Sequence, residues 1–478
     1  MHRARNIPLQ QLPERGMIAA IALDLGTTSI KAALMDPCGN LSSIVSRPAP
    51  VINGQQGRYE SDALQYAESV DAVLAQCLAG TPSKPPLGLC SQRSSFLIWD
   101  TTSGQPVTPL ISWQDDRGAN CCDRLHASAG TIQSLTGLRL TPYYFAPKLN
   151  VLLQQNPLWR KKLIESEWRV GTLDTFLIWR WTNQQHFITD VSMAARTLLM
   201  DIHQLQWSED LCRLFDVPRS VLPEIQPSTG FNLPLSNRLT LQASVGDQSA
   251  ALFASLADNR SEALVNLGTG GFVIRSLKSG ESAFNGYLQT LVCQTDQPAH
   301  FAIEGTLNSI AAALAPYPVK SCTLQELAIS DIYCLAEPSG LGAPYFRSDW
   351  GLYFSQAITH LNQQQVASLL LEAIIFRVTR IVEEFHRHAP LSAVLLSGGL
   401  SELPCLQQGI AQCSSVPVFL LQQKEASLQG AAILAAGLTV INRTARKKIM
   451  VEQANSKLNE KYLHWKQWLN VLLKIPRS

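Results

Sequence analysis

The chain has 478 residues, about three times the usual size of a single domain, so it predicts two domains or one duplicated architecture. Apolar residues make up 46% of the sequence, charged residues make up 16%, and the formal net charge is +2. These values exclude a disordered chain, a collagen and a generally basic nucleic-acid-binding protein.

Positive charge is concentrated at the C-terminal end. From Arg443 onward, nine Lys and Arg residues face two acidic residues. This pattern favours a terminal helix that packs one face on the protein and keeps its Lys side chains in solvent, rather than a contact with an anionic surface. The body has no excess of positive charge, so neither nucleic acid nor a membrane is an expected partner. Apolar residues recur at helical spacing in this tail, at Tyr462, Leu463, Trp465, Trp468, Leu469 and Leu472.

The cysteines and the first residues indicate the compartment. Eleven cysteines are scattered from Cys38 to Cys413 with no Cys-x-x-Cys pair. Such a set predicts neither disulfides nor a zinc site and is typical of a reducing cytosol. The first 16 residues lack the apolar segment of a signal peptide, and no apolar run reaches the ~18 residues of a membrane span. We therefore expect a cytoplasmic protein without membrane insertion, in which residues 1–16 are a disordered extension or precede the true start.

Two glycine turns divide pairs of apolar runs, one pair in each half of the chain. Each unit predicts a strand, a tight turn and a second strand. Two matched units predict a duplicated α/β architecture, with a seam near residues 250–258. The run, turn and run are Ile18–Leu23, Gly26–Thr28 and Ile30–Met35 in the first unit, and Ala263–Asn266, Gly268–Gly270 and Phe272–Ile274 in the second.

Three further segments have clear patterns. A third glycine turn, at residues 397–399, follows the apolar run Ala393–Leu396 and precedes a predicted helix around Leu403–Cys413. The periodicity of Val366–Phe385 predicts a half-buried helix. The Ala and Gly content of Ser427–Ile441 indicates a helix that packs closely on its neighbours.

The Gly-Thr turns allow two interpretations. Their backbone N–H groups and hydroxyls can bind a phosphate, and Lys31 could add a positive charge beside the first turn. A Gly-Thr sequence between strands is also an ordinary turn. Because two matched copies occur, the two interpretations are about equally supported.

Two aspartates and one polar cluster are candidates for the chemistry. Asp24 ends an apolar strand, where a carboxylate must be paired, capped or bound to a metal, and beside a polyphosphate that metal is Mg²⁺. Asp247 precedes an Ala-rich helix start, and in isolation it fits a helix N-cap best. The segments 91–94 and 112–117 bring polar and aromatic groups to the ends of apolar runs, as a small polyol-like ligand requires. Ordinary ion pairing of Arg93 or Arg117 with a nearby Asp is the alternative.

From about Ile18 to Leu438 the chain resembles the FGGY carbohydrate kinases, and within them it is most similar to the glycerol kinases. The resemblance implies an α/β fold with two actin-like (ribonuclease H-like) domains and an ATP and sugar cleft between them. The matching segments are ALDLGTTSIKAAL, SQR, SWQDDR, TGLRLTPYYFAPKL, GTLDTFLIW, TDVSMAARTLLMDIHQLQWSEDL, VLPEI, GDQSAAL, NLGTGGF, EGTLN, GLGAPYF and SGG.

The resemblance also implies an organisation and an activity. We expect an N-terminal domain at residues 17–250 with the acceptor site and the first phosphate loop, a nucleotide-binding domain at 251–440 and a basic helical tail at 441–478. The expected reaction is ATP-dependent phosphorylation of a hydroxyl of a small polyol or sugar, glycerol-like in the first instance. The expected partners are that acceptor and ATP with Mg²⁺, and a homodimer is compatible with the sequence.

The site residues are carried over by position. Asp247 matches the catalytic base, and Asp24 matches the aspartate near Mg²⁺. The residues that match the ATP-binding loops are Gly26, Thr27, Thr28, Ser29, Lys31, Gly268, Thr269, Ala311, Gly398 and Gly399. The residues that match the acceptor pocket are Gln92, Arg93, Ser94, Trp113, Tyr143, Gln248 and Phe272.

The chain departs from the glycerol kinases at several positions. Ser94 stands where they carry a Glu that binds acceptor hydroxyls, and Ala311 replaces a glycine on the nucleotide side. A ketose kinase of the xylulose, ribulose or sedoheptulose type is therefore an alternative, although ketopentose kinases usually read Gln-Met-His at positions 92–94. The sequence is also compatible with a weakened, sugar-sensing member of the family and with an actin-like protein that hydrolyses ATP without an acceptor.

Overall fold

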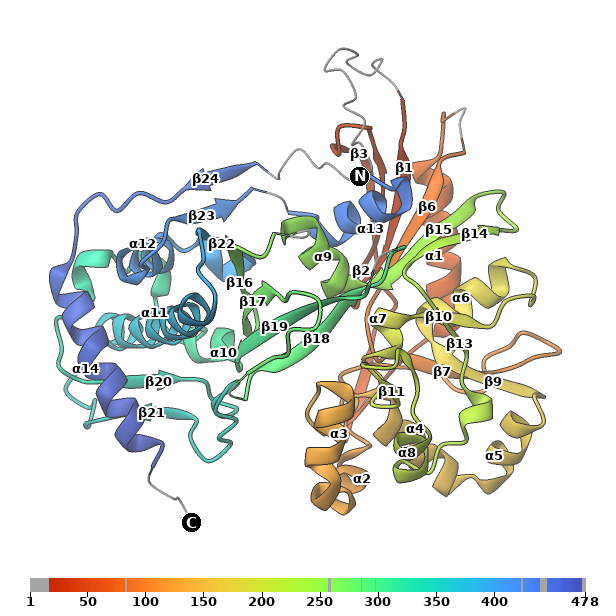
Figure 1. The fold of residues 1–478 in the computed structure, drawn as a ribbon, viewed down its shortest axis with the longest axis horizontal. Helices are drawn as coiled ribbons and strands as arrows, with labels where there is room; N and C mark the ends of the chain where they lie inside the picture. The colour runs from red at the N-terminus through yellow and green to blue at the C-terminus, as the bar shows by residue number, and fades with distance from the viewer. Residues whose placement is uncertain are drawn as a thin grey trace, which may run out of the picture.

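The computed structural model describes residues 17–81, 84–256, 259–284, 286–296, 298–422, 424–438 and 445–474. The molecule is an α/β protein whose N-terminal and C-terminal halves lie side by side, each built on a β-sheet with helices (Figure 1). The expected extension at residues 1–16 lies outside the described residues. Within the described part, each helix is too short or too polar to cross the hydrocarbon core of a bilayer.

The sheet of the N-terminal half has β1 at its centre. This strand is antiparallel to β2 and parallel to β6, which is in turn parallel to β15. β1 is apolar on both sides because its residues alternate between two buried clusters, one on each face of the sheet. The strand order is β14-β15-β6-β1-β2-β3, with bounds β14 (Thr229–Pro234), β15 (Thr240–Gly246), β6 (Pro86–Ser91), β1 (Ala20–Leu25), β2 (Ser29–Met35) and β3 (Leu41–Pro48).

The sheet of the C-terminal half repeats this pattern. β16 is antiparallel to β17 and parallel to β22, which is in turn parallel to β23. The duplicated α/β architecture predicted from the two glycine turns is therefore confirmed. The strand order is β18-β19-β17-β16-β22-β23-β24, with bounds β18 (Leu288–Cys293), β19 (His300–Leu307), β17 (Gly271–Ser276), β16 (Glu262–Leu267), β22 (Ala393–Ser397), β23 (Val418–Leu421) and β24 (Arg446–Lys448).

A further sheet and a group of helices extend the N-terminal half and have their own buried cluster. The sheet has the order β4-β5-β8-β7-β9, with bounds β4 (Asn53–Gln55), β5 (Arg58–Ser61), β8 (Leu110–Ile111), β7 (Phe96–Asp100) and β9 (Trp168–Thr172). The helices include α2 (Ala119–Arg124), α3 (Ala129–Thr136), α4 (Phe145–Gln155), α5 (Pro157–Ile164) and α8 (Glu209–Leu214).

The two halves are joined by a helix that packs across them. α13 (Ala426–Ala436) follows β23 of the second sheet but packs on β1 and β6 of the first and on α9 (Asp247–Leu256), as Figure 1 shows in blue beside red and orange. The contact is close because it uses glycines: a Cβ on Gly430 would lie 1.9 Å from the Ala250 carbonyl oxygen, and a Cβ on Gly88 would lie 2.1 Å from that of Ala431. The close packing expected for this segment is confirmed. The expected domain boundaries stay a prediction.

One long helix of the C-terminal half is more buried than its sequence suggested. α11 (Gln363–His388) was expected to be half-buried, but even Glu372 and Arg377 are buried within it. This expectation was wrong because both charges have buried partners: Arg377 Nε lies 2.7 Å from Glu337, and Glu372 pairs with Lys461. A buried charge is tolerated when it is paired in this way.

The predicted terminal helix is present as α14 (Ser456–Leu472), with Trp465 fully buried. Two details of its expected face were wrong. Leu463 is 54% exposed, and Lys461 is buried on Glu372 instead of lying in solvent. The burial of Lys461 could not be predicted, because its partner Glu372 lies on α11, far away in the sequence.

We expect the Gly430→Ala variant to be less stable than the wild type by about 2 kcal/mol or more, because an added methyl group must displace the backbone of α9. Gly130→Ala is the matched control, since Gly130 is also helical but a Cβ there meets no atom within 4 Å. That control should be neutral or stabilise by up to ~1 kcal/mol. Denaturant unfolding measures both. Equal stability of Gly430→Ala and the wild type would contradict the packing described.

Candidate active site

The first glycine turn lies at the end of β1 and is tightly closed. A Cβ on Gly26 would lie 2.5 Å from the Ser29 carbonyl oxygen, so the turn requires glycine at this position. Tyr66, on α1 (Ala63–Cys77), donates a 2.7 Å hydrogen bond to the Gly26 carbonyl oxygen. Thr27 and Thr28 follow at the tip, where Thr28 is exposed. The turn is therefore rigid, with the hydroxyl groups of a candidate phosphate loop.

Asp24 precedes this turn at the end of β1. Its Oδ2 accepts a 2.7 Å hydrogen bond from the hydroxyl of Ser427, at the start of α13. Its Oδ1 is buried and has no hydrogen-bond partner among the described residues. Burial, with a smaller contribution from the charge of Asp247, raises the pKa of Asp24 to about 6. An unsatisfied buried carboxylate oxygen of this kind fits a metal ligand.

Lys31 has a partner that the sequence did not reveal. Its ammonium lies 2.7 Å and 2.9 Å from the two carboxylate oxygens of Glu425, directly before α13. This contact joins β2 of the first sheet to the C-terminal half. The assignment of Lys31 to a phosphate loop stays a prediction, since its charge is balanced here by Glu425.

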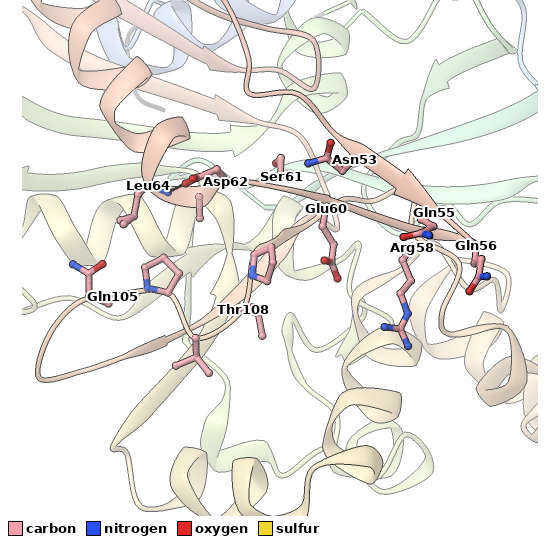
Figure 2. A pocket seen from close by; sticks show the side chains of 14 residues that line it. Asn53, Gln55, Gln56, Arg58, Glu60, Ser61, Asp62, Leu64, Gln105 and Thr108 are labelled. Atoms are coloured by element: carbon pink, nitrogen blue, oxygen red, sulfur yellow. Dashed lines mark hydrogen bonds between the residues drawn. The ribbon is translucent and has the colours of Figure 1, made fainter.

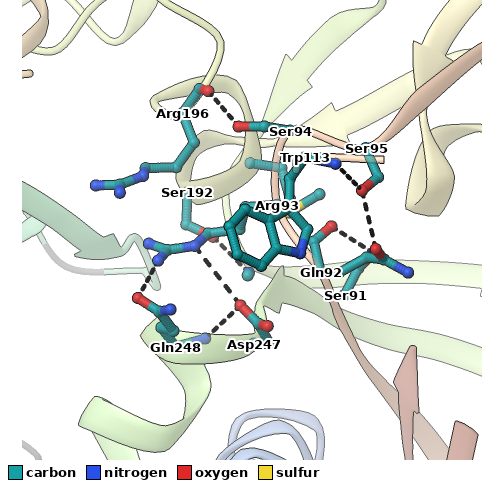
Figure 3. A network of polar contacts seen from close by, with 12 residues as sticks. Ser91, Gln92, Arg93, Ser94, Ser95, Trp113, Ser192, Arg196, Asp247 and Gln248 are labelled. Carbon is teal, nitrogen blue, oxygen red and sulfur yellow. Dashed lines mark hydrogen bonds and ion pairs between the residues drawn. The ribbon is translucent and has the colours of Figure 1, made fainter. Parts of the chain in front are cut away.

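Asp247 is the first residue of α9, where the two halves meet. Its Oδ1 lies 3.6 Å from Nε of Arg93, and it accepts a 2.7 Å hydrogen bond from the Gln248 amide. The Arg93 guanidinium also donates to the side-chain oxygen of Gln248, so it contacts both residues (Figure 3). The Asp247 side chain is 31% exposed, so it does not point into a packed interior.

The surroundings of Asp247 shift its pKa in opposite directions. Burial raises the pKa of Asp247, while the positive charge of Arg93 and, more weakly, that of Arg196 lower it. Burial lowers the pKa of Arg93 to about 10, and the charge of Arg196 contributes in the same direction. The positive charges of these two guanidinium groups favour the ionised form of Asp247.

The other acceptor residues divide into buried and exposed groups. Gln92 is buried and donates to the Gly26 carbonyl oxygen at 3.4 Å, while its own side-chain oxygen accepts a 2.9 Å hydrogen bond from Ser95. Ser94 is buried, and its hydroxyl donates to the Arg196 carbonyl oxygen at 2.8 Å. Trp113 is 40% exposed.

Trp113 and Tyr143 are the exposed aromatics of the expected pocket. The indole N–H of Trp113 donates to the Thr27 hydroxyl at 3.0 Å, so the acceptor segment contacts the first glycine turn. Tyr143 is 49% exposed and precedes Tyr144, the N-cap of α4. For Arg117 the ordinary ion-pair interpretation holds, because its Nε lies 2.7 Å from Asp115.

Two basic residues near the site were not singled out from the sequence. Lys148 on α4 is fully buried and donates to the main-chain oxygens of Ser94 and Ser112, at 3.0 Å and 2.8 Å. It joins the segments that carry Arg93 and Trp113, and burial lowers its pKa to about 7. The guanidinium of Arg196 lies 5.4 Å from the Tyr144 ring centroid, and its Nη1 is buried without a described partner.

Both residues occur in segments that carried the family resemblance, which was the available signal. Lys148 lies in the segment TGLRLTPYYFAPKL and Arg196 in TDVSMAARTLLMDIHQLQWSEDL. Their role could not be read from spacing, because each reaches Ser94 across a long stretch of chain. Figure 3 shows the Arg196 side chain on the same side of the site as that of Arg93.

The remaining glycine turns belong to the second sheet. Within the second turn the Gly268 amide donates to the Gly270 carbonyl oxygen at 2.8 Å, and the Ala311 amide donates to that of Thr269 at 3.2 Å. The third turn packs against it, since a Cβ on Gly398 would lie 2.4 Å from the Leu267 carbonyl oxygen. The segments that carry Gly268, Thr269, Ala311, Gly398 and Gly399 thus form one group.

Phe272 lies in β17 directly after the second turn, opposite Asn266 on β16 and Thr306 on β19. The structure does not record a contact of Phe272 with Arg93 or Asp247 among the described residues. Its assignment to the acceptor pocket stays a prediction.

A separate groove of about 1000 Å³ lies between β4, β5 and residues 105–109 (Figure 2). Its described lining is polar and includes Asn53, Arg58 and Glu60, but none of the expected site residues. Glu60 accepts a 2.5 Å hydrogen bond from Arg117, on the segment that carries Trp113. The groove therefore lies behind the acceptor segment and outside the site.

Comparisons with known proteins cover most of both halves. Residues 19–253 match the N-terminal domain, and residues 263–438 the C-terminal domain, of the FGGY family of carbohydrate kinases. The glycerol kinase of Saccharolobus islandicus is 30% identical over 442 residues, which cover 87% of this chain and 87% of that protein. The glycerol kinase of Limosilactobacillus reuteri is 29% identical over 447 residues, which cover 88% and 89%.

Solved structures share the fold. The glycerol kinase of Plasmodium falciparum, solved with ADP, has a TM-score of 0.83 at 22% identity and covers 96% of this chain and 99% of that one. A xylulose kinase of Rhodospirillum rubrum has a TM-score of 0.79 at 18% identity and covers 95% and 98%. With both family domains matched in order along the chain, this protein belongs to the FGGY family of carbohydrate kinases.

Proposed function

We propose that the protein transfers the γ-phosphoryl group of ATP to a hydroxyl of a small polyol or sugar, with a glycerol-like acceptor as the first choice. The observation that carries this proposal is the arrangement at the start of α9. There the Asp247 carboxylate lies 3.6 Å from Nε of Arg93, its side chain is partly exposed, and its charge interacts with those of Arg196 and of Asp24 beside the first glycine turn.

Asp247 is the proposed general base. Its carboxylate accepts the proton of the attacking hydroxyl, whose oxygen forms a bond to the γ-phosphorus. The bond from that phosphorus to the oxygen bridging the β- and γ-phosphates breaks, and ADP leaves with the electron pair. Phosphoryl transfer depends mainly on alignment and charge stabilisation, so one carboxylate and several backbone donors are sufficient protein groups.

The chain's own residues have distinct roles in this proposal. Arg93 and Gln248 orient the acceptor, and Trp113 covers its C–H face. The amides and hydroxyls of the turns at residues 26–29 and 268–270 bind phosphate oxygens, while Ala311, Gly398 and Gly399 lie on the nucleoside side. Asp24 would hold Mg²⁺ directly or through its waters, and the ion would neutralise phosphate charge.

The acceptor and the setting are also proposals. The Ser94 hydroxyl donates its hydrogen bond to the main-chain oxygen of Arg196. Ser94 therefore leaves space where a charged side chain would stand, and this favours testing larger ketoses as acceptors beside glycerol. All eleven cysteines lie in the described part of the chain and are free thiols, which suits a reducing cytosol. A monomer or a homodimer is compatible with this activity.

The proposed function is tested by coupled ADP detection with glycerol, erythritol, xylulose, ribulose and sedoheptulose. We expect acceptor-dependent ADP release with at least one of them. ADP release without any acceptor would favour the actin-like ATPase, and calorimetric binding of a sugar without turnover would favour a sugar-sensing role.

We expect the Asp247→Asn variant to lose activity by a factor of about 10²–10⁴, because an amide cannot accept the hydroxyl proton. Thermal unfolding should stay close to that of the wild type. Asp210→Asn is the matched control, since Asp210 is an exposed carboxylate near the start of another helix. A kcat of Asp247→Asn equal to that of this control would refute the assignment of the base.

We expect the Asp24→Asn variant to need about 10-fold more free Mg²⁺ for half-maximal activity at saturating ATP, since the buried oxygen that fits the ion loses its charge. Calorimetry with Mg²⁺ and ADP gives a measurement independent of turnover. An unchanged Mg²⁺ dependence would remove Asp24 from the proposed metal site.

The rate should fall as the pH falls through the raised pKa of Asp247, because only the ionised carboxylate accepts a proton. The positive charge of Arg93 lowers that pKa, so Arg93→Met should move the acid limb of the kcat profile to higher pH. Arg213→Met, at an exposed position, is the control. An acid limb that stays in place in Arg93→Met would contradict this electrostatic coupling, whatever the change in rate.

A further inference from the structure

A buried carboxylate behind the base has no role in the proposed reaction so far. Asp190 ends β10 (Ile188–Asp190), is fully buried, and caps α7 (Val191–Ala194). It accepts hydrogen bonds from the amides of Ser192 and Met193, each at 3.0 Å. It also accepts hydrogen bonds from two hydroxyls, those of Ser192 at 3.0 Å and Ser228 at 2.7 Å. An N-cap needs only the amide contacts, so the hydroxyl contacts require another explanation.

The hydroxyl of Ser192 connects Asp190 to the residue before the proposed base, Asp247. Ser192 Oγ donates to Asp190 and accepts a 2.8 Å hydrogen bond from the amide of Gly246, the residue before Asp247. A hydroxyl has a single proton, so the carboxylate fixes its direction and leaves a lone pair for the Gly246 amide. Figure 3 shows Ser192 beside Arg93.

Gly246 has little freedom to move. A Cβ there would lie 2.8 Å from Cδ of Arg93 and 3.6 Å from Oγ of Ser192, so the backbone packs directly on the guanidinium's stem. A displacement of Gly246 would therefore change the position of Asp247 and its distance from Arg93 together.

The hydroxyl of Ser228 connects Asp190 to the C-terminal half. Ser228 exchanges two hydrogen bonds with Gln294, which follows β18: its amide donates to the Gln294 carbonyl oxygen at 2.7 Å, and its Oγ accepts from the Gln294 amide at 3.1 Å. Its carbonyl oxygen also accepts from the Ser244 amide on β15 at 3.0 Å. One carboxylate thus contacts, through two serines, the turn that carries the base and the sheet of the other half.

We propose that Asp190 is a positioning residue that fixes Asp247 through Ser192 and links it to the C-terminal half through Ser228. This inference rests on the proposed function, in which Asp247 is the base. A carboxylate suits the position because both of its oxygens accept, and the surrounding groups all donate. Through the contact at Ser228, the position of the base is tied to that of β18 in the C-terminal half.

The test uses Ser192→Ala, Ser228→Ala and Asp190→Asn in the full chain, with kcat and KM measured for the acceptor and ATP. Ser192→Ala should lower kcat by roughly 10- to 100-fold, because a small displacement of a reacting group is enough for such a loss. The KM for ATP should stay within about twofold of the wild type. Ser228→Ala should lower kcat in the same way but less, since the contact with Gly246 remains.

Asp174→Asn is the matched control, because Asp174 is equally buried and accepts a 3.1 Å hydrogen bond from Thr189, next to Asp190, but has no described contact with Ser192 or Gly246. It should lose thermal stability while its kcat stays within about twofold of the wild type. A purely structural role of Asp190 predicts instead that Asp174→Asn and Asp190→Asn behave alike.

A double-mutant cycle completes the test. The cycle combines Asp190→Asn with Ser192→Ala. If Asp190 acts through Ser192, this double variant should have nearly the same kcat as Asp190→Asn alone, because both substitutions break the same chain of hydrogen bonds. Additive losses of kcat in the double variant, or a kcat of Ser192→Ala within twofold of the wild type, would overturn this inference. The proposed function would still stand in either case, because the wild type would be active. An unchanged kcat in Ser228→Ala would overturn the link to the C-terminal half. Absence of turnover in the wild type would overturn the proposed function and this inference together.

Discussion

The close packing of α13 on the first sheet and on α9 is the constraint on which the rest of the structure depends. Glycines at positions 88 and 430 let two backbones approach within a distance that any side chain would prevent. This packing brings the start of α13 to the first glycine turn, where Ser427 contacts Asp24 and Glu425 contacts Lys31. The helix α9, whose first residue is Asp247, is fixed by the same contact.

Charged side chains are costly to bury, and the protein contains two kinds of buried charge, those in ion pairs and those with an unpaired atom. Away from the site, Arg377 is paired with Glu337 and Lys461 with Glu372, although Nη1 of Arg377 and Oδ1 of Asp174 are also buried without a described partner. At the site, Asp24 and Arg196 each keep a buried atom without a described partner. Such unsatisfied groups are destabilising in the free protein, and they are expected where a ligand completes the hydrogen bonding.

Sequence reasoning was most successful where the signal is local. The strands around Gly26, Gly268 and Gly398 were predicted because apolar runs and glycine turns are read from adjacent residues. It could not identify side-chain partners that are distant in the sequence. The hydroxyl of Ser94 binds the main chain of Arg196, and the ammonium of Lys31 binds Glu425, while the assignments of both residues to the site stay predictions.

The sequence by itself determined the α/β class, the duplicated units, the family and the identity of the candidate base. The fold class and the duplicated units follow from periodicity and turn chemistry, and the family and the candidate base follow from the resemblance of short motifs to those of known kinases. Only the tertiary structure decided which groups surround Asp247: Arg93 beside it, Arg196 nearby, and Asp190 behind it through Ser192. The physical reason is that hydrogen bonds and charge interactions depend on distance in space, and the residues that form this site come from segments far apart in the chain.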